Sequence, residues 1–188
     1  MPRPKRTILQ GVTYHCFTRC HGRKNLFNRS FVKQYFVDAI NMCHEKYEFE
    51  LIAAEPVDNH IHLVIRTLEN QETISLIMQY IKSVIARKYN HRTGETGAFW
   101  NERYGCTIIE HSEDPENYLL HLLWYIGYNP VRKRLSSDPR NTELGFINCY
   151  LDKSFRCRVK ITLHRYFTSL GKTFGECVER FLFYEDAY

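Results

Sequence analysis

The sequence predicts an α+β fold, and three observations support this prediction. The chain has 188 residues, of which 44% are hydrophobic and 14% aromatic, so it can build a core. Short stretches rich in β-branched and aromatic residues alternate with longer stretches whose apolar residues recur every three or four positions. Residues 58–59 form a two-residue turn between two strand-like stretches, which indicates antiparallel pairing. We assign residues 1–135 to one domain and residues 136–188 to a partly helical C-terminal extension.

The predicted elements follow one another in a recognisable order. Residues 12–18 predict a strand, and a helix follows from Ser30, its expected N-cap, to about residue 46. Residues 49–57 and 60–67 predict a hairpin, residues 73 to about 90 a second helix, and residues 104–110 a fourth strand. This β-α-β-β-α-β order is the ferredoxin-like arrangement, an antiparallel sheet with two helices on one face.

A third helix and an irregular tail are expected after the fourth strand. Ser112, Asp114 and Pro115 provide a cap and a first-turn proline, and the helix is expected to end at Asn129, before Pro130. Residues 131–140 have the composition of a basic loop, and a further helix is predicted from about residue 162 to residue 170.

The distribution of charge and the spacing of the cysteines indicate which classes of protein are consistent with this sequence. Net charge is +5, and residues 1–30 carry seven Lys or Arg side chains and no acid, whereas residues 31–80 carry three basic and eight acidic ones. Such segregation is typical of a phosphate-binding face, with a merely solvated basic tail as the alternative. No apolar run approaches the roughly 20 residues of a membrane span, and the seven cysteines include no C-x-x-C pair. We therefore expect a soluble, cytoplasmic protein.

The candidate site combines a strand and a helix. His60 and His62 alternate with Ile61 along a predicted strand, so both imidazoles point to the same face, as half of a divalent-metal site requires. Tyr125 and Asn129 lie one turn apart on the third helix. If this helix faces the histidines, Asn129 can supply an oxygen ligand and Tyr125 a nucleophile. Half-buried histidines and packing tyrosines are the structural alternative.

These residues carry a resemblance to a known family. The segment 58–64, DNHIHLV, looks like the D/P-N-H-x-H-L-L/V signature of the single-tyrosine HUH transposases, which are IS200-like, and 124–132, WYIGYNPVR, resembles their Y-I-x-x-N-P-V-R segment. The opening MPRPKR and the segment 89–104, YNHRTGETGAFWNERY, are similar to the branch of REP-associated tyrosine transposases. The match covers about residues 1–135. After Arg134 the chain lacks the W-S-S-like segment common in the family.

The resemblance implies a mechanism. His60, His62 and Asn129 would hold Mg²⁺ or Mn²⁺, and Tyr125 would attack single-stranded DNA, leaving a 5′-phosphotyrosine and a free 3′-hydroxyl. The expected substrate is an imperfect hairpin with a flanking tetranucleotide, and the basic leader is where we expect this flank to be read. His121, one turn before Tyr125, is a candidate for activating the phenol, with a structural role as the alternative. Whether the active protein is a monomer or a homodimer stays open.

Basic residues throughout the matched region are candidates for phosphate contact. Aromatic residues between them, such as Phe99, Trp100 and Tyr104, are candidates for stacking on unpaired bases. The predicted DNA-binding residues are Arg3, Lys5, Arg6, Arg19, Arg23, Lys24, Arg87, Lys88, Arg92, Arg103, Arg132 and Arg134.

Other functions remain open at this point. The same fold could bind DNA or RNA hairpins without cutting them, or it could carry a metal-dependent phosphodiesterase that uses activated water. Tyr118 and Tyr128 share the third helix with Tyr125. We predict Tyr125 as the nucleophile because Tyr128 lies off its stripe and Tyr118 is nearly two turns away.

Overall fold

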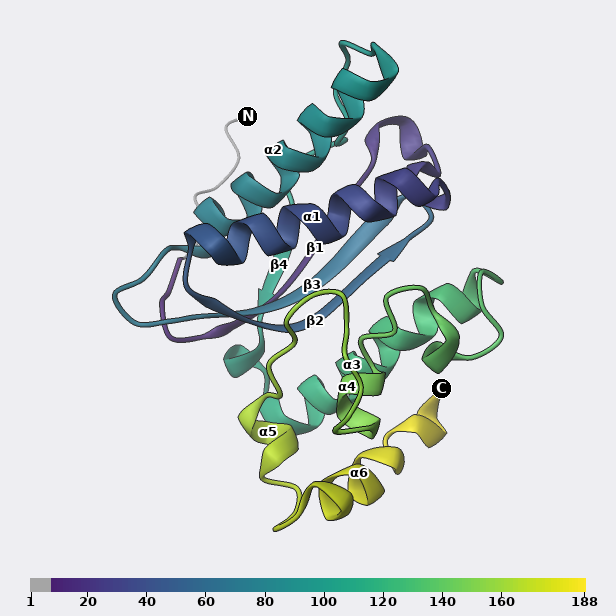
Figure 1. Cartoon of the computed structure of the whole chain (residues 1–188). Coiled ribbons are helices and arrows are strands. Elements are labelled where there is room, and N and C mark those ends of the chain that lie inside the picture. The colour runs from purple at the N-terminus through teal and green to yellow at the C-terminus, as the bar shows by residue number, and fades with distance from the viewer. Residues whose placement is uncertain (1–7) are drawn as a thin grey trace.

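The computed structural model describes residues 8–188 and has a four-stranded antiparallel sheet at its centre (Figure 1). The strands are β1 (Thr13–Arg19), β2 (Phe49–Val57), β3 (His60–Thr67) and β4 (Gly105–Ile108), in the order β2-β3-β1-β4. The helices are α1 (Ser30–Lys46), α2 (Ile74–Thr93), α3 (Pro115–Arg132), α4 (Asn148–Leu151), α5 (Arg165–Thr168) and α6 (Phe174–Leu182). Short 3-10 turns are η1 (His21–Arg23), η2 (Leu26–Asn28), η3 (Ile109–His111), η4 (Pro139–Asn141) and η5 (Glu185–Ala187). The element order and the antiparallel pairing confirm the predicted ferredoxin-like α+β fold.

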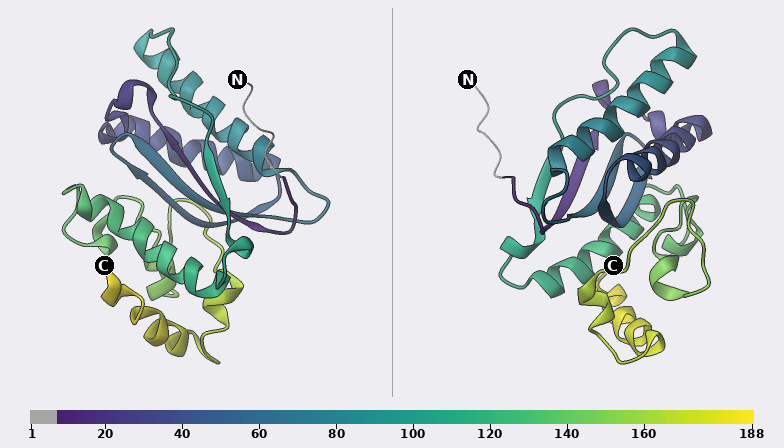
Figure 2. Two further views of the ribbon diagram at one scale, coloured as in Figure 1. Left: turned by 180° about the vertical axis from the view of Figure 1, so that it is seen from behind. Right: turned by 60° about the vertical axis from the view of Figure 1, so that its left-hand side comes forward.

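One face of the sheet is covered by α1 and α2, which lie side by side across it (Figures 1 and 2). Alternate residues of β3, among them Ile61, Leu63 and Ile65, are fully buried against the apolar stripe of α1, which includes Phe36 and Ile40. Every second residue of the strand is buried, and on the helix buried residues recur about every 3.6 positions. Both patterns agree with the prediction from the sequence. The other residues of β3, His60 and His62 among them, therefore point to the opposite face.

The opposite face is covered by α3 together with the extension, which lie on the other side of the sheet from α1 and α2 in Figure 1. Val64 of β3 and Leu123 of α3 belong to the same buried cluster as Phe181 of α6. The indole Nε1 of Trp124 donates to the carbonyl of Phe181 at 3.0 Å. Residues 136–188 therefore share a hydrophobic cluster with α3 and the sheet.

The extension differs in detail from its prediction. The helix expected over residues 162–170 is only the single turn α5, and the nine-residue helix α6 was not predicted. Residues 160–163 have no regular secondary structure instead, and the backbone N–H of Thr162 donates to the carbonyl of Leu51 on β2 at 2.7 Å. A contact 111 residues away in sequence thus replaces the local helical hydrogen bonds.

The predicted end of α3 at Asn129 was wrong, because the helix continues through Pro130 to Arg132. Pro130 has no N–H to donate to the carbonyl of Ile126 and its ring crowds that carbonyl, which is unfavourable within a helix. The residues that follow compensate with their own hydrogen bonds. Here the N–H of Lys133 donates to Asn129 O at 3.2 Å, and the N–H of Leu135 donates to Pro130 O at 2.9 Å. These bonds satisfy the carbonyls at the end of the helix.

Two predicted caps are also corrected. Asp114, and not Ser112, caps α3, because its carboxylate accepts the N–H of Asn117 at 3.0 Å. Ser30 is the first residue of α1 and its N-cap is Arg29, which makes no side-chain cap bond. Among residues 8–188, no helix combines the length and apolarity needed to cross a membrane.

Candidate active site

The β2–β3 hairpin presents two imidazoles side by side. The two-residue turn 58–59, in which Asp58 has a φ of +44°, places His60 at the first position of β3. The ring centroids of His60 and His62 are 4.9 Å apart, on the face of the sheet away from α1 and α2. Both imidazoles therefore lie together on the rigid strand, as predicted.

Helix α3 brings Tyr125 to this pair. Its leucines, including Leu119 and Leu123, are fully buried against the sheet, which leaves Tyr125 at the rim with 38% of its surface exposed. The Tyr125 ring meets the His62 ring edge-on, with centroids 5.9 Å apart. The structure thus brings three predicted residues from two separate elements into one site.

The three side chains line an open hollow of about 430 Å³. Its floor is formed by β1, where Phe17 lies opposite His62 and Arg19 opposite His60 in the strand register. Phe17 is 44% exposed, and its ring lies over Gly105, where a Cβ would collide with it. The residues lining the hollow are His15, Phe17, Thr18, Arg19, His60, His62, Asn101, Glu102, Arg103, Gly105 and Tyr125.

His15 is a site residue that the sequence analysis missed. Its Nε2 lies 3.0 Å from His62 Nδ1, and the two rings are nearly parallel. On the other histidine, His60 Nδ1 lies 3.1 Å from Asn59 Oδ1. Hydrogen bonds of this kind at Nδ1 fix the ring orientation and leave Nε2 as the ligating atom. The alternation of residues 13, 15, 17 and 19 on β1 is the sequence signal that could have revealed His15.

Burial keeps these imidazoles uncharged. It lowers the pKa of His62 well below its ordinary value, and the nearby His15 and His60 lower it further. Burial also lowers the pKa of His60, with additional effects from Arg19 and Lys133. A neutral imidazole is the form that binds a cation. The Nε2 atom of His62 is buried and has no hydrogen-bond partner, so it is available as a ligand.

Asn129 follows Tyr125 by one turn of α3. It is 7% exposed, and its buried Nδ2 has no hydrogen-bond partner. It does not line the hollow itself. In the part of the chain that the structure describes, no group of three or more His, Cys, Asp or Glu side chains could hold a metal ion. The carboxamide that we expect as the third metal ligand is therefore buried beside the hollow and is not part of its lining.

The other two tyrosines and the histidine of α3 face elsewhere. Tyr118 lines a separate hollow with Tyr14 and Cys106. The Tyr128 hydroxyl donates to Glu185 at 2.8 Å, and burial together with this carboxylate raises the pKa of Tyr128. His121 packs against Tyr184, with ring centroids 5.0 Å apart. Tyr125 is therefore the tyrosine of α3 that lines the hollow with the histidine pair.

Comparison with known proteins identifies the family. Residues 9–122 match the family model described as "Transposase IS200 like", and this span is more than half of the chain. The chain belongs to the IS200-like transposase family. The matched span of this IS200-like transposase includes both histidines of the pair and ends three residues before Tyr125.

The proteins to which this chain is similar include two described as REP-associated tyrosine transposases. A Haemophilus influenzae protein described as a REP-associated tyrosine transposase is 28% identical over 117 residues, covering 53% of this chain and 64% of that relative. The match thus spans less than two thirds of the relative's length. A solved structure of a REP-associated tyrosine transposase bound to a REP hairpin has a TM-score of 0.61 at 20% identity, covering 76% of this chain and 81% of the other. A Deinococcus radiodurans transposase structure reaches a TM-score of 0.43 at 19% identity, covering 69% and 96%.

The predicted DNA-binding residues of this IS200-like transposase are spread over several surfaces. Arg19 and Arg103 line the hollow, and the carbonyl of Arg23 accepts a hydrogen bond from Asn59 Nδ2 at 3.1 Å, beside the hairpin. Lys24 lies 4.0 Å from Glu95, and Arg134 is exposed just after α3. Arg87, Lys88 and Arg92 lie on α2, which packs on the other face of the sheet. Arg3, Lys5 and Arg6 lie outside the described residues.

The aromatic residues expected to stack on bases are mostly buried, which corrects that expectation. Phe99 is 3% exposed, and Tyr104 is buried with its hydroxyl 3.0 Å from Ser75 Oγ. Trp100 is half-buried and donates from Nε1 to Lys82 O at 2.9 Å. The segment packs against α2 because its aromatic side chains complete the core there. Phe17 and Tyr125 are the exposed aromatic residues that line the hollow.

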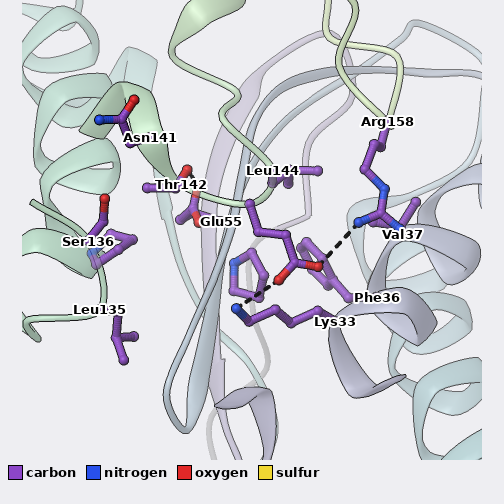
Figure 3. Close-up of a pocket in the computed structure, with 13 residues that line it drawn as sticks. Lys33, Phe36, Val37, Glu55, Leu135, Ser136, Asn141, Thr142, Leu144 and Arg158 are labelled. Carbon is purple, nitrogen blue, oxygen red and sulfur yellow. Dashed lines mark hydrogen bonds and ion pairs between the residues drawn. The ribbon is translucent and has the colours of Figure 1, made fainter. Parts of the chain in front are cut away.

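A second hollow, of about 260 Å³, lies between α1, the edge strand β2 and residues 135–144 (Figure 3). Glu143 pairs there with Lys33 at 2.9 Å and Arg158 at 3.3 Å. Buried Glu55 accepts a hydrogen bond from Thr142 Oγ1 at 3.3 Å, and burial raises its pKa well above the ordinary value. None of the predicted site residues lines this hollow. Its polar contacts instead join the extension to α1 and β2.

Proposed function

We propose that this IS200-like transposase cleaves and rejoins single-stranded DNA with Tyr125 as its nucleophile. The observation that carries the proposal is the meeting of Tyr125 with His60 and His62 in one open hollow. Pure binding of DNA needs basic and aromatic side chains. It needs neither two adjacent imidazoles, one of them with an unpartnered Nε2, nor a phenol beside them.

His60 and His62 would hold Mg²⁺ or Mn²⁺ through their Nε2 atoms, with Asn129 as the third protein ligand. The fit is supported by the unpartnered Nε2 of His62 and the unpartnered Nδ2 of Asn129. The Asn129 amide would turn its oxygen toward the metal, since amide N and O positions are assigned from hydrogen bonds. When bound, such a metal would neutralise the scissile phosphate and hold it in line with the attacking oxygen.

Tyr125 would act on the phosphorus atom of a phosphodiester. Its phenolic oxygen forms a bond to phosphorus while the bond to the 3′ oxygen breaks, and the phenolic proton passes, in net terms, to that 3′ oxygen. The products are a 5′-phosphotyrosine and a free 3′-hydroxyl. Attack of another 3′-hydroxyl on the phosphotyrosine releases Tyr125 and rejoins the strands without ATP, because the ester conserves the energy of the broken bond.

The proposed substrate is single-stranded DNA that includes a hairpin and its flank. The relative solved with a REP hairpin supports this class of partner. At the hollow, Arg19 and Arg103 would contact phosphates and Phe17 would stack on an unpaired base. We further propose that the protein acts in the bacterial cytoplasm, where it meets chromosomal DNA as a monomer or homodimer.

The test is the formation of a covalent protein–DNA adduct. Purified protein is incubated with end-labelled hairpin DNA and its flanks, with Mn²⁺ or Mg²⁺, and resolved on denaturing gels. We expect an adduct from wild type and from Tyr118→Phe, the matched tyrosine on the same helix, and none from Tyr125→Phe or in EDTA. Cleavage that survives in Tyr125→Phe would assign attack to another tyrosine or to water. Tight binding without cleavage in any protein would favour a hairpin-binding module.

A further inference from the structure

Arg132 lies between two aromatic rings at the end of α3. Its guanidinium carbon is 5.2 Å from the ring centroid of Tyr125 and 5.1 Å from that of Tyr188. Arg132 follows Tyr125 by seven residues, which is two helical turns, so both side chains lie on the same stripe of α3. The predicted phosphate contact at Arg132 is thus also a contact with the proposed nucleophile.

Tyr188 is itself held in place by the body of the protein. Its hydroxyl donates to the carbonyl of His121 at 2.8 Å, and its ring stacks on Tyr128 with centroids 6.0 Å apart and an interplanar angle of 17°. The Tyr128 hydroxyl in turn donates to Glu185, which also pairs with Arg140. The turn that carries Tyr188 is therefore anchored on both sides and can support Arg132.

Tyr125 needs such support. The ring is 38% exposed at the rim of the hollow, and its contact with the site is one edge of His62. An exposed side chain on a helix can occupy more than one staggered rotamer, and a change of rotamer would move the phenol away from its place beside His62. A planar cation against the ring face restricts this choice.

The charge of Arg132 is also available to the reaction. Within residues 8–188, no carboxylate lies within ion-pair distance of its guanidinium. No carboxylate of the described residues therefore pairs with this cation beside the phenol.

We propose that Arg132 is a positioning residue for Tyr125 and that Tyr188 of the extension supports it. The cation–π contacts of Arg132 with the two rings hold the phenol over the hollow, so the extension contributes to the reaction through Arg132. This inference rests on the proposed role of Tyr125 as the nucleophile.

Rates of adduct formation at saturating DNA test the proposal. We expect Arg132→Gln and Tyr188→Ala to lower this rate by about 10- to 100-fold, since small misplacement of a reacting group has effects of this size. Tyr188→Phe, which keeps the ring, should lose less than Tyr188→Ala. Phe183→Ala, which removes a 70% exposed aromatic residue five positions earlier, is the matched control. The dissociation constant for DNA should change little in Tyr188→Ala.

The double variant Arg132→Gln/Tyr188→Ala separates positioning from independent effects. If Tyr188 acts through Arg132, the double variant is no slower than Arg132→Gln alone. If the rate losses of the two single variants multiply in the double variant, the proposal is wrong. A faster reaction in Tyr188→Ala would also overturn it. Arg132→Gln could instead weaken DNA binding without changing the rate of adduct formation, and reduce the slope of log affinity against log salt concentration by about one. Arg132 would then be a simple phosphate contact.

A spectroscopic measurement keeps the proposal testable even if no adduct forms. Tyrosines are replaced with 3-fluorotyrosine, and the ¹⁹F resonance of Tyr125 is assigned by its loss in Tyr125→Phe. We expect this resonance to shift or broaden in Arg132→Gln and in Tyr188→Ala, and to stay unchanged in Phe183→Ala. An unchanged resonance in the first two variants overturns the positioning role. A shifted resonance without any adduct in wild type would refute the proposed chemistry alone.

Discussion

Replacing His15 with phenylalanine is expected to weaken Mn²⁺ binding by about 10- to 100-fold without DNA present. His15 and His62 are 7% and 6% exposed, so water cannot replace the hydrogen bond between them. For His62 to bind a cation through Nε2, its proton must be on Nδ1, and His15 Nε2, which lies 3.0 Å from that Nδ1, must accept the hydrogen bond from it. His15→Phe keeps a ring of similar size but removes the acceptor.

The expected magnitude follows from the cost of an unmade hydrogen bond. Leaving the buried Nδ1–H of His62 without an acceptor costs about 1–3 kcal/mol. At about 1.4 kcal/mol for each factor of ten, the metal affinity should fall by roughly 5- to 150-fold. This range agrees with the effect typical of residues that orient metal ligands.

The assay is calorimetric titration of the protein with Mn²⁺, alongside thermal melts that check the fold of each variant. His15→Gln, whose amide oxygen can accept the same proton, should recover part of the affinity. His121→Phe is the matched control, because His121 packs against Tyr184, away from the hollow. If His15→Phe binds Mn²⁺ as tightly as wild type while folded, the assigned role of His15 is wrong.

Three further predictions concern stability and DNA contact. Phe181→Ala, which removes a fully buried ring stacked on Trp124, should lower the free energy of unfolding by about 3–5 kcal/mol in urea titrations, whereas half-exposed Leu182→Ala should cost far less. Phe17→Ala should weaken single-stranded DNA binding by about 1–3 kcal/mol in fluorescence anisotropy, and an unchanged affinity would exclude base stacking there. Burial, with Arg165 and Arg66, lowers the pKa of His164 from 6.5 to about 4, so the folded state binds fewer protons than the unfolded state between these values. This contribution to stability is thus present above pH 6.5 and is lost as the pH falls toward 4, by about 1.4 kcal/mol per pH unit. His164→Asn can still cap α5 but does not titrate. Thermal melts at successive pH values should therefore show a shallower loss of stability in this variant.

Local patterns of the sequence were sufficient for the central fold. The strands 49–57 and 60–67 have the predicted bounds, because a two-residue turn and residue alternation are properties of consecutive residues. Helices α1 and α2 follow their apolar periodicity in the same way. The histidine pair shares one face because neighbouring residues of a strand alternate.

Local patterns were insufficient wherever a distant segment decides the conformation. Continuation of α3 through Pro130 depends on bonds made by residues 133–135. Residues 160–163 form no helix, because the N–H of Thr162 bonds to Leu51 of β2 instead. Phe99 and Tyr104 resemble surface aromatics in sequence, and they are buried because α2 lies over them.

For the candidate site, the sequence by itself determined the chemical groups: two imidazoles on one strand, and a phenol and a carboxamide one turn apart on a helix. Only the tertiary structure decided their neighbours. His15 meets His62 across 47 residues of sequence through strand pairing, and Tyr188 meets Arg132 across 56 residues through packing of the extension. The physical reason is the distance along the sequence over which each signal acts. Periodicity is a local signal that shows which face of an element a residue occupies, whereas the contact between two faces depends on how the whole chain packs.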